Sequence, residues 1–265
     1  MRLKEALKQF VILHRGYKFL KNLPQIRLRR ILEFSRMVMI WKVLPNTMLP
    51  IERLFSTCDC VDAINREKLS GDIVECGVWS GGCVGLMAIT DLEIGSQSRR
   101  YIMFDSFEGL PQPSAEDKEV VGSYKENHPG MDLWGEGGDS DSLTAIGACV
   151  GADQPRVESF LVSTLGIPRQ RLKFYVGWFQ DTTPVAKREL GPIAILRLDG
   201  DWYESTKVCL DNLYDLVIPN GFVIIDDYGT FTGCRKAVDE FRAIRGIKSE
   251  MVFVDDECCY FRVPI

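Results

Sequence analysis

Short apolar runs alternate with helix-like segments from about residue 70 to the end of the 265-residue chain. The short runs are rich in β-branched and aromatic residues, which is typical of buried strands. They predict strands at residues 72–78, 100–104, 172–176, 193–198, 222–225, 251–254 and 260–263. Longer segments with helical apolar spacing predict helices at 82–92, after Pro184, at 205–217 and at about 234–244.

This alternation predicts an α/β fold in which a mostly parallel, doubly wound sheet is covered by helices on both faces. The last two predicted strands are joined by only a few residues. Because parallel neighbours need a long crossover, we expect the last strand to run antiparallel. A glycine-rich, acidic insertion at about 109–154 interrupts the pattern. It is interpreted either as a lid over a substrate or as surface disorder.

The first 44 residues differ from the rest in pattern and charge. Leu3, Leu7 and Phe10 recur at helical spacing, and the first 42 residues carry a net charge of +9. We therefore divide the chain into a basic helical arm at 1–44 and one domain at 45–265. The arm is interpreted either as a helix on an anionic membrane surface, or as one packed on the domain or on a second subunit.

Composition excludes several classes of protein. With only His14 and His128 present, a triple-histidine zinc site and an H-E-x-x-H metalloprotease motif are excluded, which leaves carboxylates as the expected chemical groups. The chain after residue 42 carries −14, and this argues against a nucleic-acid partner. The nine cysteines are scattered, and no apolar segment approaches the roughly 20 residues of a membrane span. We therefore expect a cytoplasmic protein with reduced thiols.

A glycine-rich turn follows the first predicted strand. Glycines permit tight turns and close approach of a ligand to the backbone, and the following helix start offers free N–H groups. The spacing is not that of the dinucleotide motif G-x-G-x-x-G. Glu75, just before the turn, suits a ligand with an ammonium group. Glycine-rich turns also occur for packing alone, so the motif leaves both interpretations open.

Acidic residues end three further predicted strands. Asp105 follows the second strand and is placed to accept both hydroxyls of a ribose, or to cap the next turn. Asp199 and Asp201 follow the fourth strand, and Asp226 and Asp227 follow the fifth. Because these carboxylates meet at one sheet edge and repel one another, we expect a hard cation, Mg²⁺ or else Mn²⁺ or Ca²⁺, between them. The alternative is separate capping acids on solvated loops.

Five motifs in this order resemble the macrocin O-methyltransferase (TylF/MycF) family of S-adenosylmethionine-dependent sugar O-methyltransferases. They read ECGVWSGG at 75–82, DSFEGLP at 105–111, GWFQDTTP at 177–184, LDGDWYEST at 198–206 and IDDY at 225–228. The likeness starts at NTMLPIERL, residues 46–54, and extends to about residue 263. It implies a class I methyltransferase (Rossmann-like) fold with a seven-stranded, mostly parallel sheet and an antiparallel last strand.

The resemblance also implies roles for individual residues. The residues expected to bind S-adenosylmethionine are Thr47, Met48, Glu75, Gly77, Val78, Trp79, Ser80, Asp105, Ser106, Phe107 and Asp181. Among them, Glu75, Gly77 and Trp79 line the methionine end, Asp105 and Ser106 hold the ribose, and Asp181 lies near the adenine. Thr47 and Met48 close over the cofactor. The family's Mg²⁺ ligands correspond to Asp199, Asp226 and Asp227.

The expected reaction is methylation of a hydroxyl on a sugar or glycosylated small molecule, with Mg²⁺ chelating two neighbouring hydroxyls. Asp199, or alternatively Asp201, accepts the proton. Two other classes stay open: a Mg²⁺-dependent phosphoester hydrolase, and a non-catalytic protein that binds S-adenosylmethionine. The insertion carries little of the likeness, so the acceptor need not be an antibiotic sugar. We also expect a homodimer or a higher homo-oligomer.

Overall fold

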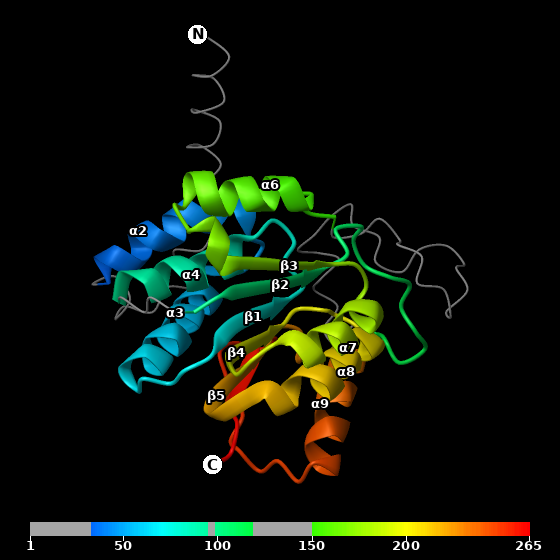
Figure 1. Cartoon of the computed structure of the whole chain (residues 1–265). Helices are drawn as coiled ribbons and strands as arrows, with labels where there is room; N and C mark the ends of the chain where they lie inside the picture. Colours follow the sequence, from blue (N-terminus) through cyan, green and yellow to red (C-terminus); the bar gives the residue numbers. More distant parts are fainter. Residues whose placement is uncertain (1–32, 95–98, 119–149) are drawn as a thin grey trace.

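The computed structural model describes residues 33–94, 99–118 and 150–265. Most of the predicted arm and of the predicted insertion therefore lies outside the described residues. The described chain contains a seven-stranded sheet with the strand order β3-β2-β1-β4-β5-β7-β6. In Figure 1 the sheet forms a central layer with helices on both sides. The predicted α/β class is confirmed.

Five parallel strands bring their carboxyl ends to one edge of this sheet. β1 to β5 pair in parallel, β7 pairs antiparallel with β5, and β6 pairs antiparallel with β7. The predicted reversal of the last strand is therefore confirmed. The strands are β1 (Asp72–Cys76), β2 (Tyr101–Asp105), β3 (Leu172–Val176), β4 (Ile193–Leu198), β5 (Val217–Ile225), β6 (Val252–Phe253) and β7 (Cys259–Arg262).

Every strand except β6, whose two residues are exposed, serves two hydrophobic cores because successive side chains point to opposite faces. In β2, Tyr101 and Met103 join the core under α2, α3 and α4, whereas Ile102 and Phe104 join the core under α7, α8 and α9. The helices are α2 (Phe34–Val43), α3 (Ile51–Arg66), α4 (Gly82–Ile94), α6 (Gln154–Ser159), α7 (Phe179–Glu189), α8 (Tyr203–Leu213) and α9 (Thr232–Ile244). Short turns η3 (Leu44–Asn46), η4 (Phe160–Thr164), η5 (Arg169–Arg171) and η6 (Tyr214–Leu216) complete them.

The predicted starts of one helix and one strand are wrong, and each of these two elements contains a proline. Helix α7 begins at Phe179, so Pro184 stands inside it, where its missing N–H removes one backbone hydrogen bond. The hydroxyls of Thr182 and Thr183 donate to backbone carbonyls one turn earlier and support that turn. Strand β5 begins at Val217 because the turn-forming residues 219–221 lie in a register irregularity of the β4–β5 pair and do not end the strand.

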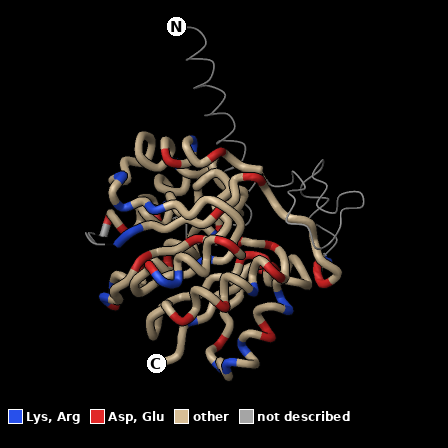
Figure 2. Tube along the Cα trace, turned by 45° about the vertical axis from the view of Figure 1, so that its right-hand side comes forward, with Lys and Arg blue, Asp and Glu red and all other residues tan. Residues whose placement is uncertain are grey.

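Helix α2, the described end of the predicted arm, packs on the domain. Met39, Ile40 and Val43 are buried in the core shared with α3 and α4. Arg36 adds ion pairs to Asp59 and other carboxylates. The boundary at residue 44 stays a prediction. Figure 2 shows Lys and Arg interspersed with Asp and Glu along the described trace. Within that trace, no helix combines the length and apolarity needed to cross a membrane.

Candidate active site

A cavity of about 860 Å³ lies at the carboxyl ends of the five parallel strands. Residues that follow each of these strands line it, together with the segment before α3 and the turn between β6 and β7. This volume lies within the range of roughly 300–1,000 Å³ for small-molecule sites. Ligands of open α/β sheets bind at this edge. The cavity is therefore the candidate active site.

The turn after β1 packs against the backbone that carries Asp199. Gly77 has a φ of +87° and Trp79 a φ of +49°, so the turn uses left-handed backbone conformations. A Cβ atom at Gly77 would stand 1.8 Å from the carbonyl oxygen of Asp199. Only glycine fits there. The glycine turn and the end of β4 are consequently fixed relative to each other.

Glu75 is fully buried and holds two elements together. One carboxylate oxygen accepts a hydrogen bond from the backbone N–H of Val84 in α4, at 2.9 Å. The other accepts from Nη1 of Arg197 in β4, also at 2.9 Å. Burial raises the pKa of Glu75 to about 7, although Arg197 opposes the rise. Its contact with the methionine end of a cofactor stays a prediction.

Asp105 organises the same turn from the end of β2. Its Oδ2 accepts from the backbone N–H groups of Val78 (2.6 Å) and Trp79 (3.0 Å), and its Oδ1 accepts from that of Phe107 (2.7 Å). Burial raises the pKa of Asp105, while these three hydrogen bonds act in the opposite direction. Asp105 and Ser106 both line the cavity, where a ribose is predicted to bind.

Three aspartates form a cluster with the spacing of metal ligands. Asp199, Asp226 and Asp227 each offer an oxygen, and these oxygens all lie within 4.8 Å of one another. Asp227 is 94% buried, and its Oδ2 has no hydrogen-bond partner among the described residues. Burial, joined by repulsion from neighbouring aspartates, raises the pKa of Asp227 and of Asp201. The pKa of Asp199 is raised by burial against the pull of Arg197.

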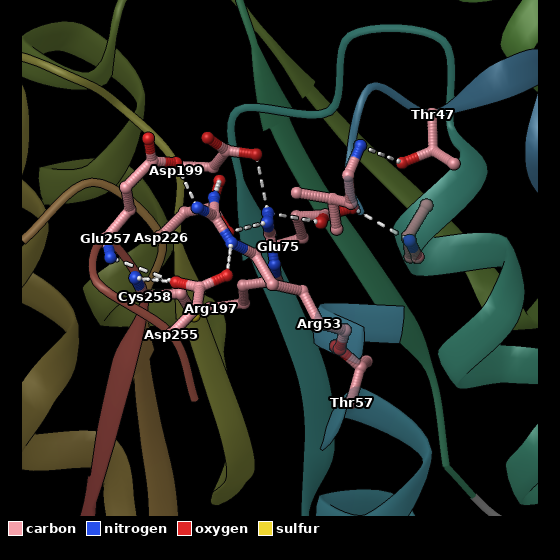
Figure 3. Close-up of polar contacts among 12 residues, drawn as sticks. Thr47, Arg53, Thr57, Glu75, Arg197, Asp199, Asp226, Asp255, Glu257 and Cys258 are labelled. Atoms are coloured by element: carbon pink, nitrogen blue, oxygen red, sulfur yellow. Dashed lines mark hydrogen bonds and ion pairs between the residues drawn. The ribbon is translucent and has the colours of Figure 1, made fainter. Parts of the chain in front are cut away.

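Two arginines without an assigned role in the sequence analysis hold Asp199 and Asp226 of this cluster (Figure 3). Arg197 is fully buried, and besides Glu75 it contacts Asp199 Oδ2 at 2.6 Å and Asp226 Oδ1 at 2.8 Å. Arg53 of α3 contacts Asp226 from the other side. Burial by itself lowers the pKa of each guanidinium, but the effect of the surrounding carboxylates is larger. The pKa of both arginines is therefore raised above its usual value. The sequence pattern singles out Arg197, because it is a charged residue within an otherwise apolar strand. No such pattern singles out Arg53.

The structure gathers most predicted site residues around one cavity and leaves three out. Those lining it are Thr47, Met48, Glu75, Gly77, Val78, Trp79, Asp105, Ser106, Asp199, Asp201, Asp226 and Asp227. Ser80 is buried behind the turn, where its hydroxyl accepts from the backbone of Ala152. Phe107 packs against the hydrophobic core, and Asp181 is exposed on α7. Cofactor contacts by Ser80, Phe107 and Asp181 stay predictions.

The sheet order, the reversed last strand and the site at the parallel edge define a class I S-adenosylmethionine-dependent methyltransferase fold. The solved structure of the O-methyltransferase NovP has this fold, with a TM-score of 0.66 and 31% identity, over 83% of each chain. That of the calicheamicin methyltransferase CalS11, 19% identical, superposes with a TM-score of 0.59 over 87% of this chain and 92% of its own.

The chain belongs to the macrocin-O-methyltransferase (TylF) family, which it matches over residues 24–131 and 141–263. It is 33% identical, over 84% of this chain and 77% of the relative, to the 8-demethyl-8-(2,3-dimethoxy-alpha-L-rhamnosyl)-tetracenomycin-C 4'-O-methyltransferase of Streptomyces olivaceus. It is 32% identical to the mycinamicin III 3''-O-methyltransferase of Micromonospora griseorubida, over 82% of this chain and 78% of that one. The family resemblance in the motifs is confirmed.

Proposed function

We propose that this protein is an S-adenosylmethionine- and Mg²⁺-dependent O-methyltransferase that acts on a hydroxyl of a sugar or of a glycosylated small molecule. The observation that carries the proposal is the cluster of Asp199, Asp226 and Asp227 in the cavity beside the glycine turn. Family membership supports the reaction type. Two relatives whose names specify methylation of a rhamnosyl-tetracenomycin and of mycinamicin III support a glycosylated acceptor.

The residues present fit a hard cation. The cluster offers carboxylate oxygens, which Mg²⁺ prefers. The buried Oδ2 of Asp227, which has no partner in the part of the chain that the structure describes, is an acceptor in need of a donor or a cation. The two guanidinium groups contact five carboxylates, and Asp201 and Asp227 add two more, so negative charge remains in excess when all of them are ionised. The five are those of Glu75, Asp199, Asp226, Asp255 and Glu257. A cofactor with ammonium and sulfonium groups suits the same acidic cavity.

The chain's own side chains divide the remaining tasks. When bound, Mg²⁺ would supply a Lewis acid that lowers the pKa of the acceptor hydroxyl, and S-adenosylmethionine would supply the methyl group. Asp199, Asp226 and Asp227 would hold the cation. Asp199 would also accept the hydroxyl proton, with Asp201, which lines the same cavity, as the alternative. Glu75 ties the start of α4 to β4, and Asp105 holds the glycine turn in shape.

The test is methyl transfer with labelled S-adenosylmethionine to a panel of glycosides, with Mg²⁺ or with EDTA. We expect label in at least one glycoside, dependent on Mg²⁺. Binding of S-adenosylhomocysteine is measured first by thermal shift, where a hundredfold excess over Kd stabilises by about 2.7 kcal/mol. Absence of that shift would refute the cofactor assignment. Release of phosphate from phosphoesters without a methyl donor would instead favour a hydrolase.

Three further proposals concern assembly and location. The basic arm supports a homodimer or a higher homo-oligomer, and peripheral contact with an anionic membrane, whereas the nine scattered cysteines support a cytoplasmic location. The arm's net charge of +9 over 42 residues suits either acidic lipids or the acidic body of a second copy. Light scattering tests for a second copy, and liposome sedimentation tests for a membrane. Each assay compares the full chain with a chain lacking residues 1–32. Fractionation of cells that express the full chain tests the location.

A further inference from the structure

Arg53 connects α3 to the far wall of the cavity. Its side chain is only 7% exposed. Nε donates to Asp255 Oδ2 at 2.6 Å, Nη1 donates to Asp226 Oδ2 at 3.2 Å, and Nη2 donates to Glu257. Asp255 and Glu257 lie in the turn between β6 and β7, more than 200 residues away in sequence. One planar group thus joins three elements (Figure 3).

The shape of this contact sets the orientation of Asp226. The two carboxylates of the β6–β7 turn hold the guanidinium on one side, so that Nη1 is left facing Asp226. The Oδ1 of Asp226 faces Arg197 at 2.8 Å. Asp226 is therefore fixed from both sides. A guanidinium presents several donors in a rigid plane, whereas a lysine ammonium is a point charge on a flexible stem.

We propose that Arg53 is a positioning residue for the metal site: it holds Asp226 in the orientation in which the three-aspartate cluster binds a divalent cation. This inference rests on the metal site of the proposed function. Groups that orient metal ligands typically change metal affinity by about 10–100-fold when replaced. A role confined to fold stability would lower the melting temperature and leave cation affinity in the folded protein unchanged.

The test compares two charge-conserving variants of the full chain. Arg53→Lys keeps the positive charge but loses the fork, so the electrostatic attraction of the site for a cation stays similar. Arg36→Lys is its matched control, since Arg36 also pairs with three carboxylates, Glu33, Asp59 and Asp62, but does not line the cavity. Mn²⁺ affinity is measured by electron paramagnetic resonance titration without cofactor, at a temperature where each variant is folded.

We expect Arg53→Lys to weaken Mn²⁺ binding about tenfold or more. Arg36→Lys should stay within about twofold of the wild type. A folded Arg53→Lys with wild-type affinity, or an equal loss in Arg36→Lys, overturns the inference while the proposed function stands. Failure of the wild type to bind Mn²⁺ overturns the metal site and this inference together.

A second pair of variants covers the case in which Arg53→Lys does not fold. In Asp255→Asn, the remaining oxygen can still accept the backbone hydrogen bonds of the β6–β7 turn. The new amide NH₂ group faces Arg53 Nε and cannot accept its hydrogen bond. Asp256→Asn removes the same charge from the same cavity wall, at a residue outside the three carboxylates that Arg53 contacts. Weaker Mn²⁺ binding in Asp255→Asn than in Asp256→Asn supports the role of Arg53. Equal binding in the two refutes it.

Discussion

Replacement of Gly77 by alanine tests whether the glycine turn and the metal site are one rigid unit. The added Cβ would stand 1.8 Å from the carbonyl oxygen and 2.7 Å from the carbonyl carbon of Asp199. Backbone atoms have no rotamer that avoids such a contact, so either the turn or the end of β4 must move. The substitution also places a side chain at a φ of +87°.

Two effects contribute to the expected loss of stability, and a second glycine separates them. A left-handed conformation costs a non-glycine residue roughly 1–2 kcal/mol. Forcing extra atoms into a packed site costs about 1–3 kcal/mol more. Gly246 has a φ of +63°, and none of the described residues other than its two chain neighbours comes within 4 Å of a Cβ atom built there, so Gly246→Ala carries only the first effect. Gly77→Ala should therefore destabilise by about 1–3 kcal/mol more than Gly246→Ala.

The assay is urea unfolding of both variants, followed by binding of S-adenosylhomocysteine and Mn²⁺. Because the displaced backbone carries Asp199, we expect Gly77→Ala to weaken both ligands, with Mn²⁺ affinity falling about tenfold. Gly246→Ala should bind both as the wild type does. Equal stability of the two variants, together with normal binding by Gly77→Ala, would refute the coupling between turn and metal site.

Three further predictions follow from the site. Asp226→Asn, and EDTA added to the wild type, should abolish Mg²⁺-dependent methyl transfer in the labelled assay and leave the calorimetric affinity for S-adenosylhomocysteine nearly unchanged. Arg197→Met leaves buried carboxylates without their partner and should cost about 3–5 kcal/mol in urea unfolding. The pKa of Glu75 rises from 4.5 to about 7 on folding, so the folded state binds the proton more tightly. Thermal stability in EDTA should therefore fall as pH increases between these values, and Glu75→Gln should flatten that part of the profile.

Patterns within single segments predicted the sheet well. The strands at 172–176 and 193–198 agree with the structure because each apolar run is short and has clear ends. Helix α3 has no counterpart in the prediction, since two buried polar residues, Arg53 and Thr57, interrupt its apolar face. The three-aspartate cluster was predictable because parallel strands end at a common edge, and that rule needs no knowledge of strand register.

The two arginines show where the sequence stops being sufficient. Arg197 stands opposite Glu75 only because β1 and β4 pair in that register, which their apolar patterns do not define. Arg53 meets Asp255 across 202 residues of sequence, through the packing of α3 against the end of the sheet. The glycine and acidic motifs indicate which groups bind ligands. The groups that orient them depend on tertiary packing.

The two arginines also explain how a folded chain keeps so many acids in one cavity. A buried ion pair stabilises a fold little, if at all, relative to apolar residues of the same volume, so stability alone gives little reason for an arginine in the apolar strand β4. Its contacts give a reason, because Arg197 links Glu75, beside the glycine turn, to Asp199 and Asp226 of the cluster. Arg53 then links Asp226 to the opposite wall. Because both arginines contact Asp226, we expect a substitution at either end of the cavity to change the position of Asp226, one of the three residues proposed to hold the cation.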